Sequence, residues 1–147
     1  MSWQELQEHE PELAAFGERR FGSRVAYLAT VDADGSPRVH PVTPIVTPQG
    51  LMVFMQPTSP KGHDLRRGGR YALHCSVEDD EGGGGEFRVR GTAREVNDTA
   101  LREQVTDHAP YVPSDDYVLF ELLVDGAFST TYDADGSPIR HRWRAGG

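Results

Sequence analysis

The stretch SPKGHDLRRG, residues 59–68, groups the residue types best suited to bind an anion. Lys61 is the only lysine in the chain, since fourteen of its fifteen Lys and Arg residues are arginines. A serine hydroxyl, backbone N–H groups at the start of a short helix and one ammonium form a compact site for phosphate. Arg38, on a neighbouring strand, adds a planar guanidinium to the same anion. The alternative is that Lys61 and the nearby arginines lie on the solvated face of a helix.

Other patterns typical of catalysis are absent from the sequence. The run EGGGGE lacks the Lys and Ser/Thr of a phosphate-binding loop, and acidic residues flank it. There is no HExxH motif and no paired CxxC, and the six histidines do not cluster, so we predict no metal site. Cys75 lies in an apolar strand, where a core role is commoner than a nucleophilic one. The sequence therefore identifies no catalytic side chain.

The composition limits the classes of partner. The formal net charge is −8, whereas a nucleic-acid binder needs a basic face. One cysteine allows no internal disulfide. The polar start MSWQELQEHE does not resemble a signal peptide, and no apolar run approaches the roughly 18–20 residues of a membrane helix. We therefore expect a cytoplasmic protein without a nucleic-acid or membrane partner.

The elements that position these residues follow from periodicity and turn chemistry. Ser2 begins a helical region over residues 2–22, and Glu5 stands three residues later, at the spacing of a capping box. Pro11 starts a second helical segment. Residues 24–31, 38–47 and 51–56 are predicted as a three-strand meander, with the proline-containing strand at an edge or bulged. A short helix closed by Gly68–Gly69 follows Ser59. Further strands are predicted at 71–78, 86–96, 117–124, 126–133 and 139–144, with a helix over 97–109 capped by Asn97 or Asp98.

Seven or eight strands with short helices predict a mainly β protein, built as an antiparallel closed or half-open barrel. The segment DADGSP occurs at residues 32–37 and again at 133–138. Asp-Gly supplies the positive φ of a tight hairpin, so we interpret the two copies as similar turns and not as a structural repeat. The length suits one domain, residues 1–147, divided into an N-terminal helix (1–22), a core sheet (24–96), and a helix with closing strands (97–147).

Three segments in this order carry a resemblance to a known family: ATVDADGSPRVHPV, GLMVFMQPTSPKGHDLRRGGRYALHC and EFRVRGTAREV. SPKGHDL resembles a Ser-x-Lys-x-x-x-Leu phosphate segment, RGTAREV a Gly-x-Ala strand, and IRHRWR a basic closing strand with tryptophan. On these motifs the chain resembles the pyridoxamine 5′-phosphate oxidase-like superfamily of FMN-binding split barrels, which includes flavin and deazaflavin oxidoreductases. The resemblance implies an antiparallel split β-barrel and a homodimer with cofactor sites at the subunit interface.

The resemblance also implies roles for particular residues. Ser59, Lys61 and Arg38 match phosphate contacts. The strand beside the isoalloxazine ring matches Val39, His40, Pro41 and Val42, and the strand flanking the ring matches Phe54 and Met55. Trp143, with Arg142, matches a C-terminal segment contributed by the other subunit. His40 is the best side chain for proton exchange near the ring, and a histidine simply packed in a strand is an equally open interpretation.

The implied activity is hydride transfer between a flavin-type cofactor and a small organic substrate. The cofactor expected is FMN, with the deazaflavin coenzyme F-420 and then haem as alternatives. The final basic set RHRWR is smaller than the substrate-phosphate cluster of the true oxidases, so we expect a substrate other than pyridoxamine 5′-phosphate. Pro60 stands where those oxidases often have a basic residue. The alternative function is a non-catalytic cofactor- or haem-binding split-barrel protein.

Overall fold

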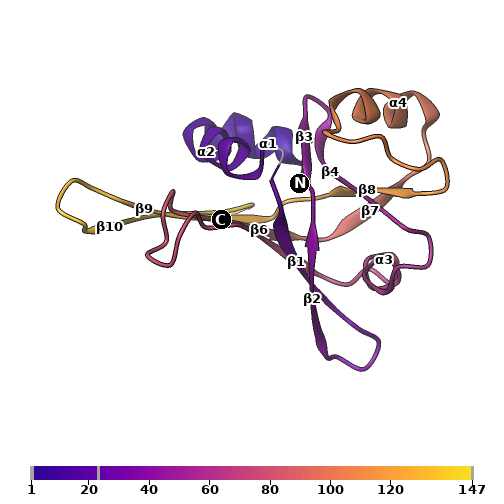
Figure 1. Ribbon diagram of the computed structural model, residues 1–147, viewed down its shortest axis with the longest axis horizontal. Helices are drawn as coiled ribbons and strands as arrows, with labels where there is room; N and C mark the ends of the chain where they lie inside the picture. Colours follow the sequence, from indigo (N-terminus) through magenta and orange to yellow (C-terminus); the bar gives the residue numbers. More distant parts are fainter. Residues whose placement is uncertain (1, 23, 147) are drawn as a thin grey trace.

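The computed structural model describes residues 2–22 and 24–146, which form two sheets and four helices (Figure 1). The helices are α1 (Trp3–His9), α2 (Pro11–Phe21), α3 (Pro60–Arg66) and α4 (Thr99–His108). The strands are β1 (Ala26–Val31), β2 (Pro37–Val42), β3 (Ile45–Thr47), β4 (Gly50–Met55), β5 (Tyr71–Cys75), β6 (Glu86–Gly91), β7 (Ala93–Val96), β8 (Val118–Leu122), β9 (Gly126–Tyr132) and β10 (Pro138–Arg144).

All strand pairs are antiparallel, which confirms the predicted mainly β class with short helices. The six-stranded sheet has the order β10-β9-β6-β5-β1-β2, and the four-stranded sheet has the order β3-β4-β8-β7. Across the described residues, no helix combines the length and the apolar character needed to cross a membrane.

The predicted N-terminal helices and their break at Pro11 are confirmed. Ser2 accepts a hydrogen bond from the Glu5 N–H, and the Glu5 carboxylate accepts one from the Ser2 N–H, which completes a capping box. The buried rings of Trp3 and Phe21 contact Phe87 of β6, with ring centroids 6.0 and 5.2 Å apart. Helices α1 and α2 therefore cover one face of the six-stranded sheet (Figure 1).

The two DADGSP segments form the same turn. In each, the first Asp accepts hydrogen bonds from the N–H groups two and four residues later, as Asp32 and Asp133 show. The glycines have positive φ, +85° at Gly35 and +84° at Gly136, which residues with a side chain rarely adopt. The repeat is local turn chemistry, as predicted.

Two predicted strands are each divided between the sheets, so the described residues contain ten strands and not the seven or eight predicted. The segment 38–47 forms edge strand β2 and then, beyond Pro44, strand β3 of the other sheet, because proline cannot continue the ladder. The consecutive pairings of the predicted meander form, as β1 with β2 and β3 with β4, and the predicted edge position of β2 is confirmed. The meander is divided between two sheets, however, because β4 pairs with β3 and β8. The segment 86–96 passes from β6 to β7 at Gly91, where a Cβ would lie 2.0 Å from the Leu123 carbonyl oxygen.

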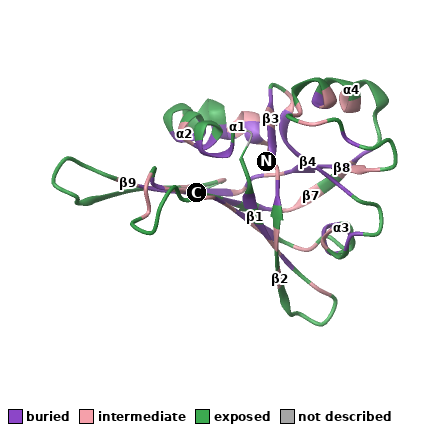
Figure 2. Cartoon of the chain, in the orientation of Figure 1, coloured by how far each residue is buried: buried purple, intermediate pink, exposed green. Residues whose placement is uncertain are grey.

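Two groups of buried apolar side chains hold these layers together. The larger joins the two sheets and the N-terminal helices, and it includes Leu28, Val53 and Phe120. The smaller joins the four-stranded sheet to α4 and includes Met52 and Val105. Strand β4 is buried along its whole length because it supplies side chains to both groups (Figure 2). This burial fixes the end of β4, from which the chain runs into α3.

Candidate functional site

A cavity of about 450 Å³ lies where β2, the end of β4 and the start of α3 meet. Seven of the ten cofactor residues predicted from the sequence line this cavity: His40, Pro41, Val42, Phe54, Met55, Ser59 and Lys61. The sequence reasoning missed four further lining residues, Gln56, Thr58, Pro60 and Tyr117. Three of these are sequence neighbours of Ser59 and could have been found from that proximity. Tyr117 follows α4, and no local pattern indicates that it reaches the cavity.

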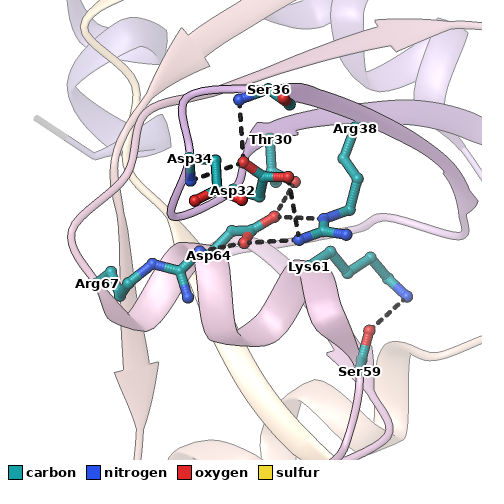
Figure 3. Close-up of polar contacts among 9 residues, drawn as sticks. All are labelled: Thr30, Asp32, Asp34, Ser36, Arg38, Ser59, Lys61, Asp64 and Arg67. Carbon is teal, nitrogen blue, oxygen red and sulfur yellow. Dashed lines mark hydrogen bonds and ion pairs between the residues drawn. The ribbon is translucent and has the colours of Figure 1, made fainter.

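The polar side of the cavity is formed by Ser59 and Lys61. The Lys61 Nζ donates a hydrogen bond to Ser59 Oγ at 2.9 Å (Figure 3). Ser59 precedes α3, but its side chain makes no capping hydrogen bond. Pro60 stands in the first turn, where its nitrogen carries no hydrogen and therefore requires no acceptor. Burial lowers the pKa of Lys61. Within the described residues Lys61 contacts no carboxylate, so its ammonium is available to an anionic ligand.

His40 supplies a second polar group to the same cavity. Its Nε2 is buried and has no hydrogen-bond partner among the described residues. Burial lowers the pKa of His40, and the nearby cations Lys61 and Arg38 lower it further. The imidazole is therefore neutral near pH 7. Buried polar nitrogens usually have a hydrogen-bond partner, so this nitrogen is a candidate to hydrogen-bond a ligand in the cavity.

Arg38 does not line the cavity, because its guanidinium is held by Asp64 of α3. The Arg38 Nε donates to Asp64 Oδ2 at 2.9 Å, and Asp64 also accepts hydrogen bonds from Thr30, at 2.7 Å, and from Arg67 (Figure 3). Burial alone would raise the pKa of Asp64, but these three hydrogen bonds outweigh it and lower that pKa. The sequence reasoning missed Asp64, although it lies three residues after Lys61 on the predicted helix.

Val39 and Trp143 lie outside the cavity in this chain. Successive residues of a strand point to opposite faces, so Val39 points away from His40 and is 65% exposed. Trp143 is on β10, at the other end of the six-stranded sheet, where its ring stacks on His9 with centroids 6.3 Å apart. Their predicted contacts with a cofactor therefore stay predictions that need a second subunit.

The arrangement suits a ligand with an apolar ring and an anionic group. Phe54, Met55 and Val42 form apolar walls, and Lys61 with Ser59 offers an ammonium and a hydroxyl at one side. Such a combination of apolar lining and few polar groups is typical of small-molecule sites. Elsewhere in the described part of the chain, no group of three or more His, Cys, Asp or Glu side chains is placed to hold a metal ion.

Comparisons with known proteins agree with the fold and with the family resemblance. The family model described as pyridoxamine 5′-phosphate oxidase matches residues 10–131. A search of curated protein sequences found no significant match.

Several solved structures share the fold. A haem binding protein from Mycobacterium smegmatis is 17% identical, with a TM-score of 0.67, over 88% of this chain and 57% of that chain. The chain therefore spans less than two thirds of that protein. HutZ, the haem storage protein from Vibrio cholerae, is 22% identical, with a TM-score of 0.58, over 78% of this chain and 89% of that chain. PhzG from Burkholderia lata, solved with tetrahydrophenazine-1-carboxylic acid, is 16% identical, with a TM-score of 0.65, over 97% of this chain and 87% of that chain.

These structures show the fold alone at such identities, whereas the family match covers most of the chain. It includes both strands and the helix that line the cavity. The chain belongs to the pyridoxamine 5′-phosphate oxidase family and has the split-barrel fold of that superfamily.

Proposed function

We propose that the protein binds a phosphate-bearing flavin cofactor in the cavity between β2, β4 and α3 and acts as an oxidoreductase on a small organic substrate. The observation that carries the proposal is the pairing of Lys61 with Ser59 beside the buried Nε2 of His40, which has no hydrogen-bond partner in the part of the chain that the structure describes. FMN is the first candidate, and the deazaflavin coenzyme is the alternative flavin-type cofactor. Family membership supports a cofactor of this kind.

The residues present fit such a cofactor. Lys61 and Ser59 would hold the phosphate, because an ammonium and a hydroxyl form charge-assisted hydrogen bonds with its oxygens. Pro41 and Val42 of β2 and Phe54 of β4 would flank the ring system and exclude water from it. When bound, the cofactor accepts or donates the hydride, and the protein supplies orientation and electrostatics.

His40 would act on the ring side of the cavity in its neutral form. Its pKa is lowered, so near pH 7 the imidazole can accept a proton or donate its own ring N–H. The substrate class is a small organic molecule, and PhzG, which was solved with a ring carboxylic acid, makes such a compound a reasonable first choice. Pyridoxamine 5′-phosphate is not the substrate that we propose.

A second candidate is binding of haem without catalysis. Two relatives with the same fold are haem proteins, as their names state. A neutral histidine is a common axial ligand of haem iron, and His40 offers a neutral imidazole in the cavity. This candidate predicts a haem absorption band in place of a flavin spectrum.

We also propose that the protein is a homodimer. The outer face of the β1–β2 hairpin exposes Tyr27 (47%), Val31 (42%) and Val39 (65%), which is unusual for a group of apolar side chains in a sheet. A second copy on this face would cover them. It could also bring its own Trp143 towards the cofactor, as the family resemblance implies.

Separate equilibrium titrations with FMN, the deazaflavin coenzyme and haem test the proposal. We expect saturable quenching of the fluorescence of one flavin-type cofactor, and, where that cofactor is FMN, a yellow complex that bleaches with dithionite and recovers its colour in air. Lys61→Gln should weaken the binding of the cofactor. Arg24→Gln is its charge-matched control, because Arg24 is exposed and contacts Glu78, outside the cavity. Binding of haem alone would replace the oxidoreductase by the haem-binding candidate, and failure of all three to bind would overturn both.

A further inference from the structure

Arg102 of α4 contacts two elements that meet at the cavity between β2, β4 and α3, which we call the cofactor cavity. Its Nη1–H donates to the Tyr117 carbonyl oxygen at 2.6 Å, and its Nη2–H donates to the Ser114 carbonyl oxygen at 3.2 Å. Its guanidinium carbon lies 5.1 Å from the centroid of the Phe54 ring. Arg102 itself does not line the cavity, so it acts on the lining from behind.

Phe54 and Tyr117 are the aromatic residues of the cavity lining. In the register of β4 and β8, Met55 pairs with Val118, so the two aromatic residues come from neighbouring ends of paired strands. Both also pack in the smaller apolar group between the four-stranded sheet and α4. Phe54 is 6% exposed, and Tyr117 is half-buried. We call these two residues the aromatic wall.

Tyr117 stands at the end of a loop, residues 109–117, that connects α4 to β8. The Tyr117 N–H donates to the Ser114 carbonyl oxygen at 3.0 Å, which closes a turn. Arg102 donates to the carbonyl oxygens at both ends of this turn. A guanidinium presents several N–H donors in one rigid plane, so it can hold two carbonyl oxygens at once. The turn that carries Tyr117 is therefore fixed to α4 through one side chain.

The charge of Arg102 is not used in an ion pair. Seven other arginines contact carboxylates, but Arg102 contacts none within the ranges that the structure describes. Its partners are two neutral carbonyl groups and the Phe54 ring. A cation above an aromatic ring is attracted by the electrons of the ring face, and this attraction orients the ring. Hydrogen bonds thus place Tyr117, and the cation–π contact places Phe54.

We propose that Arg102 is a positioning residue of the cofactor cavity and holds the aromatic wall where it contacts the ring system of the bound cofactor. This inference rests on the proposed function, because the ring system is that of the proposed flavin-type cofactor. Arg102 acts only through Phe54 and Tyr117. It should therefore affect the binding of the ring system, whereas Lys61 should affect the binding of the phosphate.

Titrations of Arg102→Met with FMN and with riboflavin test this inference, because riboflavin has the same ring system without the phosphate. We expect both affinities to fall by about fivefold or more, and by the same factor. Lys61→Gln should weaken the binding of FMN and leave that of riboflavin unchanged. Arg19→Met is the matched control, since Arg19 also lies over a ring, that of Phe16 at 5.9 Å, but is exposed and outside the cavity. If the natural chain prefers the deazaflavin coenzyme, that coenzyme and its phosphate-free deazariboflavin replace the two ligands.

A second measurement uses the cofactor-free protein. Hydrogen exchange followed by mass spectrometry reports on the backbone N–H groups of residues 110–118, which include that of Tyr117. Arg102→Met should exchange this segment about fivefold faster, and Arg19→Met should leave it unchanged. Arg102→Lys keeps the charge without the planar guanidinium, so its exchange should resemble that of Arg102→Met. Urea unfolding of each variant checks that the fold is kept.

The outcomes separate this inference from the proposed function. If the natural chain binds no flavin-type cofactor, the proposed function fails, and the role of Arg102 at a cofactor fails with it. If the natural chain binds flavin and Arg102→Met binds it as tightly, only the role of Arg102 fails. A loss of affinity for FMN alone would also overturn that role, because it would place Arg102 at the phosphate. Unchanged exchange of residues 110–118 in Arg102→Met would overturn it whether or not flavin binds.

Discussion

The side chain of Arg38 donates its Nε–H to the buried carboxylate of Asp64 at 2.9 Å, and this ion pair joins the β1–β2 hairpin to helix α3 (Figure 3). Asp64 is 1% exposed, and Thr30 and Arg67 donate to the same carboxylate. The pair therefore fixes the helix that carries Lys61 relative to the strand that carries His40. In this structure Arg38 has a positioning role, and its contact with a cofactor phosphate stays a prediction.

Asp64→Asn should lower the free energy of unfolding by about 1–3 kcal/mol, because a neutral amide cannot accept the charge-assisted hydrogen bonds of two arginines. The pKa of Asp64 is lower in the folded protein than its ordinary value of 3.8. The resulting stabilisation is present above that value and is lost as the pH falls through the lowered folded-state pKa.

Urea unfolding at pH 7 and at several pH values below 4 tests this prediction. Asp64→Asn should show a weaker loss of stability in acid than the natural chain does. Asp79→Asn, at an exposed turn, is the control. Equal acid sensitivity of Asp64→Asn and the natural chain would contradict the assignment.

Lys61→Gln should weaken the binding of a phosphorylated cofactor by about 1–3 kcal/mol, the loss expected for one charge-assisted contact. Stability should change little, because among residues 2–22 and 24–146 the Lys61 ammonium donates a hydrogen bond to Ser59 alone. Fluorescence titration measures the affinity, and Arg24→Gln removes the same charge elsewhere. If both variants bind equally well, Lys61 is not a phosphate ligand.

The pKa of His40 should lie below its ordinary value of 6.5 in the cofactor-free protein, because burial and two cations disfavour its charged form. This pKa should rise when a phosphorylated cofactor binds, since the anion offsets Lys61. Titration of the imidazole signal by NMR, with and without cofactor, measures both values.

The lowered pKa of His40 also makes the free energy of unfolding depend on pH. The unfolded chain takes up more protons than the folded one as the pH drops below 6.5, so His40 makes the protein less stable in that direction. His40→Phe should remove this component. A pKa that does not move on cofactor binding would separate His40 from the site.

Gly91→Ala should destabilise the protein by about 3 kcal/mol or more, because the new Cβ would overlap the Leu123 carbonyl where the chain changes sheets. Gly35→Ala is the comparison, since its Cβ meets no atom within 4 Å and only the positive φ opposes it. That variant should lose about 1–2 kcal/mol. Urea unfolding of both measures the difference, and a smaller loss at Gly91 would be inconsistent with the close contact.

Val39→Asp should convert the proposed homodimer to monomer, because it places a charge on the exposed apolar face of β2. Light scattering after size exclusion measures the mass against 16.3 kDa for one chain. Val112→Asp is the matched control, as Val112 is 93% exposed and lies between α4 and β8. A natural chain that elutes as a monomer would remove the proposed interface.

The sequence alone determined the features that depend on neighbours within a few residues. The capping box of Ser2 and Glu5, the two DADGSP turns and the break at Pro11 all form as predicted. In such features the interacting groups are fixed by local spacing. The motif around Lys61 likewise indicated the family, and seven of the ten predicted cofactor residues meet in one cavity.

Only the tertiary structure decided the features that depend on distant segments. No local pattern in the sequence indicates that residues 38–47 and 86–96 are each divided between two sheets. The same holds for the position of Tyr117 at the cavity and for the hydrogen-bond partners of Asp64. The order of the strands in each sheet determines these contacts. That order depends on which apolar faces are buried together, and a local pattern of residues does not contain this information.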